Sequence, residues 1–291
     1  MKYTIQNKYL SATVAHNGIE LCSIKSKATD VEYMWQGNPD IWGSYAPVLF
    51  PIIGMLKNDT YYFNGESYSM PKHGLVRSSD KNVLLKQTDD SLLFSMKWDE
   101  ELLKQYPFKF EIQTRFILKE RVLQVQHTIF NHDAKTMYFS LGGHPAFNCP
   151  LYEDETYEDY FLEFEHSETA STYLLAPDNT ISNNTELILD GTKKLPLHSH
   201  LFDRDALIFK DLKSRSVNLN SRNNGKILTV NYDGFPYLGI WAKPKAPFVC
   251  IEPWLGIADT VDTDQHLINK EGIQSLASDK EFEASYEIEI H

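Results

Sequence analysis

The chain has 291 residues, of which 42% are hydrophobic, and its 28 basic and 40 acidic residues leave a formal charge of −12. This charge repels phosphate backbones and anionic membrane surfaces, so nucleic-acid and membrane partners are disfavoured. The first residues lack the apolar core of a secretory signal, and no apolar run approaches the ~18 residues that would span a bilayer. We therefore expect a soluble, cytoplasmic protein.

Three cysteines occur, Cys22, Cys149 and Cys250, without any CxxC spacing. An odd number of cysteines without that spacing predicts neither a disulfide framework nor a zinc knuckle. We expect reduced and mostly buried thiols.

Short apolar runs broken by turn residues predict strands from the start of the chain, beginning with residues 2–25. The clearest local signal is Asn64-Gly65 between the apolar runs 61–63 and 66–70. This pair predicts a two-residue hairpin, because both turn positions need a positive φ. A helical pattern occurs only over residues 99–105, where Asp99 is the candidate N-cap.

Residues 108–118 alternate apolar and polar side chains, which predicts a long strand with one buried face. The next apolar run, residues 123–129, is its expected partner. His127 shares the apolar face of that run, so it is predicted to be a hydrogen-bonded core histidine and not a catalytic one.

The second half of the chain also predicts strands. Residues 150–203 are acidic and rich in turn residues, with modest strands at 162–164 and 185–189. Further short strands are expected at residues 206–209, 217–219, 226–232 and 237–242, and a strictly alternating strand at 282–290. Without a linker or an internal repeat, we predict one all-β domain over residues 1–291, either a large sandwich or a barrel.

The stretch SLGGHPAFN places His144 after two glycines and before Pro145. The glycines remove side-chain bulk, and the proline favours an extended conformation at His144. An imidazole presented in this way suits acid–base chemistry near neutral pH. The alternative is a loop histidine that only hydrogen-bonds a backbone carbonyl.

The stretch APFVCIEPWL places Glu252 on the same face of a predicted strand as Phe248 and Cys250, with Pro253 and Trp254 ending that strand. A carboxyl among apolar neighbours has a raised pKa, as a general base at neutral pH requires. The alternative is a structural ion pair with a lysine. A second histidine, His73, lies in the turn-like stretch PKHGLVR, four residues before Arg77.

Together these stretches resemble the aldose 1-epimerase family, the galactose mutarotases, and most of all its shorter LacX-like branch. The resemblance runs through APVLFPIIG, HGLVR, GGHPAFN, LFDRDALIF and CIEPW to the final strand. It implies a β-supersandwich of large antiparallel sheets with a sugar site in a cleft, in a protein that acts as an isomerase on carbohydrates.

The resemblance also implies roles for individual residues. Glu252 takes the role of general base on the C1 hydroxyl, and His144 that of general acid on the ring oxygen. His73 is expected to hydrogen-bond the sugar, together with Asp205 or, less favourably, Asp203. No metal or cofactor is implied, and the expected partner is a small-molecule sugar bound to a monomer or homodimer.

One departure from the family pattern concerns the substrate. Galactose mutarotases carry a substrate-binding arginine after the equivalent of Ile53, whereas Met55, Leu56 and Lys57 follow Gly54 here. Arg77 is a candidate replacement, since HGxxR resembles relatives that act on hexose 6-phosphates. The alternative is that Arg77 and Lys72 are ordinary cations on a solvated strand edge. The predicted substrate is a free aldohexose, with a hexose 6-phosphate as the alternative.

Other chemistries have little support. GxSxG, GxGxxG and Walker sequences are absent, which disfavours serine hydrolases and nucleotide-binding enzymes. Two histidines and a glutamate are zinc ligands in principle, but their spacing matches no zinc pattern. Trp42, Trp241 and Trp254 are core candidates that also suit stacking on a sugar, with Trp254 the predicted substrate contact. A non-catalytic sugar-binding or sensing protein is the remaining alternative.

Overall fold

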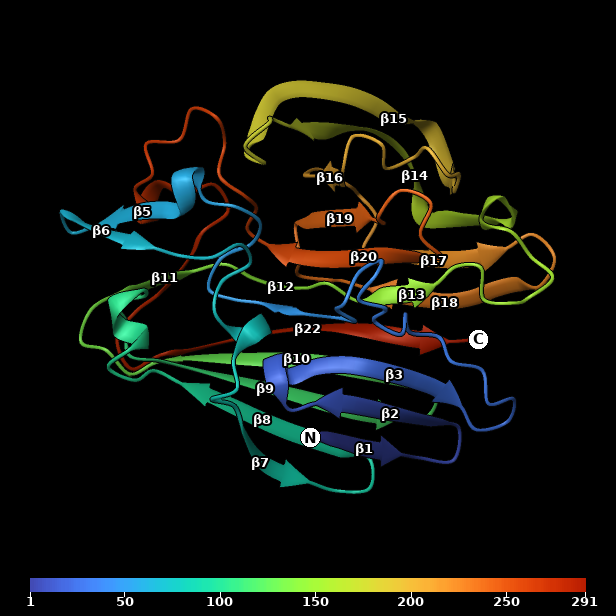
Figure 1. The fold of residues 1–291 in the computed structure, drawn as a ribbon, viewed down its shortest axis with the longest axis horizontal. Coiled ribbons are helices and arrows are strands. Elements are labelled where there is room, and N and C mark those ends of the chain that lie inside the picture. The colour runs from blue at the N-terminus through green and yellow to red at the C-terminus, as the bar shows by residue number, and fades with distance from the viewer.

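The computed structural model covers residues 1–291 and consists of antiparallel sheets joined by loops and short helices (Figure 1). The largest sheet has nine strands in the order β15-β14-β17-β18-β22-β10-β9-β8-β7. Its strands are β7 (Val83–Gln87), β8 (Ser91–Lys97), β9 (Phe110–Lys119), β10 (Val122–Asn131), β14 (Tyr160–Leu175), β15 (Ile181–Pro196), β17 (Ser216–Ser221), β18 (Gly225–Asn231) and β22 (Glu281–Ile290).

A second sheet has six strands, in the order β16-β19-β20-β12-β4 with β13 also pairing with β20. Its strands are β4 (Val48–Leu49), β12 (Leu141–Gly143), β13 (Ala146–Asn148), β16 (Leu207–Phe209), β19 (Tyr237–Trp241) and β20 (Phe248–Leu255). The smaller sheets comprise β1 (Lys2–Gln6), β2 (Leu10–Ala15) and β3 (Glu20–Ser26), then β5 (Thr60–Phe63) with β6 (Glu66–Ser69), and β11 (Met137–Phe139) with β21 (Gln274–Leu276).

All helices are single 3₁₀ turns. They are η1 (Asn17–Ile19), η2 (Lys57–Asp59), η3 (Val76–Ser78), η4 (Leu102–Lys104), η5 (Tyr157–Asp159) and η6 (Leu267–Asn269). The helical stretch predicted over residues 99–105 is confined to η4, and its N-cap is Glu101 instead of the predicted Asp99. The Asp99 carboxylate still accepts a hydrogen bond from the Leu102 N–H at 2.8 Å. None of the helices has the length and apolar character needed to cross a membrane.

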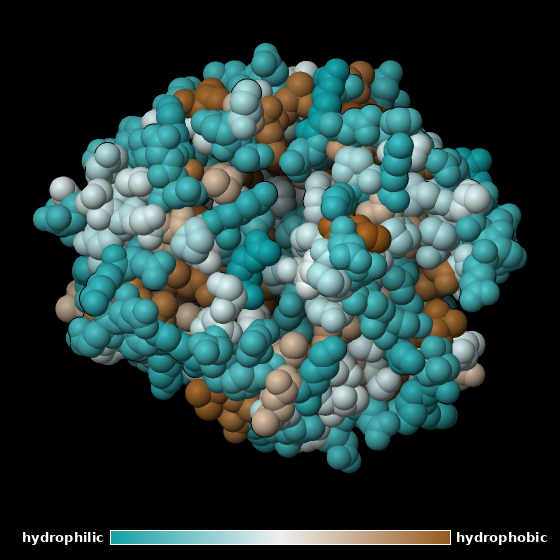
Figure 2. Space-filling view, in the orientation of Figure 1, coloured by the Kyte–Doolittle hydropathy of each residue, from teal (hydrophilic) through white to brown (hydrophobic).

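The six-stranded sheet packs on the nine-stranded sheet around one hydrophobic cluster that extends from Ile5 to Ile290. Gly143 of β12 shows how closely they approach, because a Cβ atom there would lie 2.7 Å from the ring of Tyr286 in β22. The large sheet ends at the edge strands β7 and β15 and does not close on itself. The fold is therefore a supersandwich, and the barrel alternative is wrong. On the face shown in Figure 2, polar side chains predominate and apolar ones lie in scattered groups.

Several local predictions are confirmed. Asn64 and Gly65 have φ values of 52° and 83° and connect β5 to β6. The alternating run at 108–118 becomes β9, which pairs with β10. His127 of β10 is 1% exposed, and its Nδ1 lies 3.0 Å from the Thr114 hydroxyl, as expected for a core histidine.

Two predicted strands are much too short. The modest strands expected at 162–164 and 185–189 belong to β14 and β15, which have 16 residues each. These strands pair with several register shifts, and most side chains of β15 are exposed. A long polar hairpin with bulges lacks the alternation by which a half-buried strand is recognised, so the sequence pattern missed it.

Candidate functional site

Strand β20 forms the floor of the site. All eight residues of this strand are buried, and Glu252 is only 1% exposed. Cys250 and Glu252 lie on the same face by alternation, as predicted. The expected end of the strand at Pro253 is wrong, since pairing continues with Leu238 opposite Pro253 and Tyr237 opposite Trp254. Partner strands on both sides hold this segment extended through the proline.

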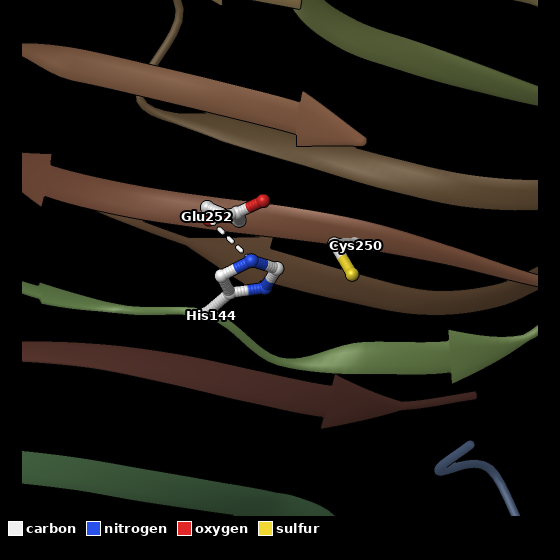
Figure 3. A group of neighbouring side chains, drawn as sticks. All are labelled: His144, Cys250 and Glu252. Atoms are coloured by element: carbon white, nitrogen blue, oxygen red, sulfur yellow. Dashed lines mark ion pairs between the residues drawn. The ribbon is translucent and has the colours of Figure 1, made fainter. Parts of the chain in front are cut away.

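His144 lies in the connection between β12 and β13, beside β20. Its backbone N–H donates to the Pro47 carbonyl at 3.1 Å, and its side chain is buried against Trp42, whose ring stacks on the imidazole with a centroid distance of 5.0 Å. The Nε2 of His144 lies 3.3 Å from the Oε2 of Glu252 (Figure 3). Segments far apart in the sequence thus bring the His144 imidazole and the Glu252 carboxyl together at a buried site.

A cavity of about 330 Å³ opens above this pair. Its wall includes all six residues that the sequence predicted for the site: His73, Arg77, His144, Asp205, Glu252 and Trp254. The fold therefore gathers the predicted residues around one cavity, and their catalytic and binding roles stay predictions.

His73 is fixed by a reciprocal contact with Gly54. The His73 N–H donates to the Gly54 carbonyl at 2.9 Å, and the Gly54 N–H donates to His73 Nδ1 at 3.1 Å. Because Nδ1 accepts, a neutral ring carries its proton on Nε2. The backbone φ of His73 is 66°, a strained value for a non-glycine residue of the kind that concentrates at functional sites.

Arg77 lies in η3 and Lys72 in the turn before His73, so the alternative that placed both on a strand edge is wrong. Both side chains line the cavity. Neither has an ion-pair partner within 4.0 Å. Lys57, by contrast, donates to the Val261 carbonyl at 2.6 Å, and Met55 forms the cavity wall after Gly54. Arg77 is therefore the arginine available to a ligand here.

The two candidate aspartates are separated by the structure. Asp205 lines the cavity, with its carboxylate accepting a hydrogen bond from the Ala206 N–H at 2.7 Å. Asp203 does not line it and instead contacts His200 Nδ1 at 2.9 Å. The preference for Asp205 over Asp203 agrees with this placement.

Trp254 is held between two glycines of neighbouring strands. A Cβ atom at Gly239 of β19 would lie 2.3 Å from the indole, and one at Gly142 of β12 would lie 2.9 Å from it. The indole is 6% exposed and forms part of the cavity wall. Only residues without a side chain at 142 and 239 leave room for this ring.

Burial dominates the electrostatics of the site. It raises the pKa of Glu252 well above its ordinary value. Burial, together with the positive charges of Arg77 and Lys72, lowers the pKa of His144 to about 3. The pKa of His73 is also lowered, by burial and then by His144. Burial therefore favours the neutral forms of all three groups.

Cys250 adds a thiol to this group. One donor atom from each of His144, Cys250 and Glu252 lies within 4.8 Å of the other two (Figure 3). This is the combination of nitrogen, sulfur and oxygen that soft divalent metals accept. The metal ligands considered from the sequence were the two histidines and the glutamate, and Cys250 was not among them.

Sequence reasoning also missed the part of the wall contributed by the β14–β15 hairpin. Leu175 and Asn179 reach the cavity from its tip, where Asn179 has a φ of 62°. No motif marks Asn179, and only the length of the hairpin brings it to the site. Trp42 and Trp241, first regarded as core candidates, line the cavity as well.

Comparison with known proteins shows the family and the fold of the chain. Residues 1–270 match the model of the family described as Aldose 1-epimerase. Two curated relatives, the plasmid and chromosomal forms of protein LacX from Lactococcus lactis subsp. lactis, are each 35% identical, with 100% of this chain and 99% of the relative aligned.

Two solved structures are similar over the full chain. A galactose mutarotase related enzyme from Lactobacillus acidophilus has a TM-score of 0.95 and 38% identity, covering 100% of this chain and 97% of that one. A galactose mutarotase-like protein from Lactobacillus casei has a TM-score of 0.93 and 31% identity, covering 100% of both chains. The chain therefore belongs to the aldose 1-epimerase family and has the galactose mutarotase-like fold.

Proposed function

We propose that this protein interconverts the α and β anomers of a free aldohexose by acid–base ring opening and closure. The observation that carries the proposal is the buried pair of Glu252 and His144, whose Oε2 and Nε2 atoms lie 3.3 Å apart beside a 330 Å³ cavity. Small-molecule pockets span about 300 to 1,000 Å³, so a cavity of this size suits a monosaccharide. Membership of the family supports a carbohydrate as ligand.

The reaction requires one group that removes a proton and one that supplies a proton. Glu252 takes the proton of the C1 hydroxyl while His144 gives a proton to the ring oxygen, and the bond between C1 and that oxygen breaks. Rotation about C1–C2 then presents the other face of the aldehyde. Ring closure returns each proton to the group from which it came.

The buried pair holds the one proton that this cycle needs. It exists either as a carboxylic acid beside a neutral imidazole or as a carboxylate beside an imidazolium, and transfer across 3.3 Å interconverts the two forms. Burial favours the neutral form. Hydrogen bonds from a sugar replace lost solvation and favour the ionic form, from which ring opening starts.

Three further residues are assigned to binding. The Nε2–H of His73 is free to donate to the sugar, because its Nδ1 is occupied by the Gly54 N–H. Asp205 accepts hydrogen bonds from sugar hydroxyls at the open side of the cavity, and the Trp254 indole provides an apolar surface for a sugar face. Arg77 supplies the donors that the missing family arginine would have given.

Polarimetry tests the proposal directly. Freshly dissolved α-glucose and α-galactose are mixed with the protein, and the decay of optical rotation is compared with that in buffer. Acceleration in proportion to protein concentration is expected. If binding of the same sugars is measured without any acceleration, the chain is a sugar-binding or sensing protein and the enzymatic proposal fails.

A hexose 6-phosphate is a second candidate substrate, favoured by one observation. Arg77 and Lys72 line the cavity without an ion-pair partner, although Arg77 is partly buried. A guanidinium with free donors is suited to a phosphate group. Against this, the formal charge of −12 opposes anionic ligands, even though it is screened beyond ~8 Å at physiological salt.

Anomerisation rates for glucose, galactose and their 6-phosphates decide between the two. A higher rate with the neutral sugars supports the primary proposal. A preference for a phosphate that disappears in Arg77→Ala would replace it with the second candidate. Lys86→Ala, which removes an exposed cation from strand β7, is the matched control for loss of charge.

A further inference from the structure

We propose that His144, Cys250 and Glu252 form a binding site for one soft divalent cation, such as Zn²⁺, whose occupancy shuts off the acid–base pair. Binding itself is independent of the proposed function. Only the consequence, inhibition of anomer exchange, rests on that function.

The donor set is complete without any large rearrangement. The three donor atoms lie within 4.8 Å of one another, and those of His144 and Glu252 are already 3.3 Å apart. Zinc bonds of ~2.0–2.3 Å to nitrogen, oxygen and sulfur place tetrahedral ligands roughly 3.5 Å apart. Side-chain rotations that move the donor atoms of Cys250 and Glu252 by about 1 Å would therefore bring all three donors to bonding distance from one cation.

The donor atoms are also free to bind. The Glu252 Oε2 atom is buried without a hydrogen-bond partner, the His144 Nε2 atom has the 3.3 Å contact with it, and all three cysteines are free thiols. A buried carboxyl oxygen without a partner is uncommon, and a cation at this position would satisfy it. His144 and Glu252 line the cavity, which gives a cation its path to the site.

Charge selects the kind of cation. A thiolate and a carboxylate together neutralise a divalent ion, while the thiol proton and any carboxyl proton leave to solvent. Lys72 and Arg77 line the same cavity and repel cations, so hard ions that gain little from sulfur are disfavoured. With three protein ligands, the fourth position faces the cavity and accepts water.

Occupancy has a clear consequence for the reaction. A cation at this site takes the lone pairs with which Glu252 and His144 would accept protons, and it stands beside the position proposed for C1 of the sugar. Metal and sugar are therefore expected to exclude one another, and a chelator is expected to restore activity.

Calorimetric titration of the full chain with Zn²⁺, after dialysis against a chelator, tests the site. One Zn²⁺ per chain is expected. Cys250→Ala should weaken binding at least ~10-fold, since even the loss of an outer-shell partner commonly costs 10–100-fold. Cys149→Ala removes another buried thiol outside the cluster and should bind as the unaltered protein does.

Cobalt provides a second readout that does not depend on activity. Co²⁺ at the site should show a thiolate-to-cobalt charge-transfer band that is absent in Cys250→Ala and in Cys250→Ser. Thermal melts determine whether each variant is folded. If only one of the two folds, the comparison with the unaltered protein uses that variant.

The site is refuted if the unaltered chain binds no Zn²⁺, or if binding is equally strong without the Cys250 thiol. Binding with this signature in a protein that never accelerates anomer exchange would retain the metal site and reject the enzymatic proposal. Anomer exchange that continues unchanged when calorimetry shows the site filled with Zn²⁺ would retain the enzymatic proposal and overturn the inhibition.

Discussion

The imidazole Nε2 of His144 lies 3.3 Å from the carboxyl Oε2 of Glu252, with both side chains at least nine-tenths buried. Glu252 lies in β20, and His144 lies in the connection between β12 and β13. Both β12 and β13 pair with β20 through backbone hydrogen bonds. Rigid strands therefore fix the separation of a proton donor and a proton acceptor.

His144→Asn is expected to lower kcat at least ~10²-fold, because a positioned acid or base usually contributes that much. Sugar affinity should change far less, since the other cavity residues stay in place. Steady-state anomerisation and calorimetric sugar binding measure the two quantities. His127→Asn is the control: it alters another buried histidine, in the core of β10, and should affect stability while turnover per folded molecule stays normal.

Glu252→Gln is expected to make the protein more stable at neutral and alkaline pH. Burial raises the folded-state pKa of Glu252 above its ordinary value of 4.5. The contribution of this carboxyl group to the free energy of unfolding is therefore fully present below pH 4.5 and is lost as the pH rises through the raised pKa. Glutamine mimics the neutral carboxyl and removes this loss. Thermal melts from pH 4 to pH 8 should show a gap in Tm that widens with pH. A constant gap would contradict the raised pKa.

Gly239→Ala is expected to impair sugar binding through Trp254. The added methyl would lie 2.3 Å from the indole, so the ring must leave its position in the cavity wall. Forced repacking of this kind costs about 1–3 kcal/mol of stability, and KM should rise more than kcat falls. Gly43→Ala is the control, because its methyl would meet no atom closer than 3.7 Å. Unchanged KM in Gly239→Ala would remove Trp254 from the binding surface.

Lys270→Met is expected to destabilise the fold by about 3–5 kcal/mol, the usual effect of leaving one buried charge unpaired. Lys270 Nζ lies 2.7 Å from the Asp259 carboxylate, and both side chains are 3% exposed. The Asp259 backbone in turn binds Met55 and Ile181, which connects the pair to the cavity wall and to β15.

Denaturant unfolding measures that cost. The double variant Lys270→Met with Asp259→Asn should recover part of it, since no charge is then left unpaired. Lys25→Met breaks an exposed pair with Asp30 and should cost at most ~1 kcal/mol. Equal effects of Lys270→Met and Lys25→Met would show that the buried pair is not structurally important.

The sequence predicted those parts of the fold in which local pattern and tertiary packing agree. Alternation at 108–118 and the Asn64-Gly65 turn correspond to β9 and to the β5–β6 connection. Strands β14 and β15 were underestimated, because their exposed residues and register shifts leave no periodic signal. Proline normally interrupts a strand, yet β20 passes through Pro253 because neighbouring strands hold it on both sides.

The candidate site was predictable where a motif surrounds the residue. His73, His144 and Glu252 stand in distinctive stretches, and they meet at one cavity. Asn179 reaches the same cavity only because the β14–β15 hairpin is long, which no pattern in its own neighbourhood indicates. Cys250 lies next to Glu252 on β20, but its closeness to His144 depends on how the strands pair.

The most direct measurement of the proposed chemistry is exchange NMR between the α and β anomeric protons of a hexose at equilibrium. With the unaltered protein, cross-peaks between the two anomers should appear at mixing times too short for the uncatalysed reaction. With Glu252→Gln they should disappear while the sugar still binds. Catalysis by the Glu252–His144 pair would be contradicted if both proteins gave cross-peaks of equal intensity, or if neither protein gave cross-peaks.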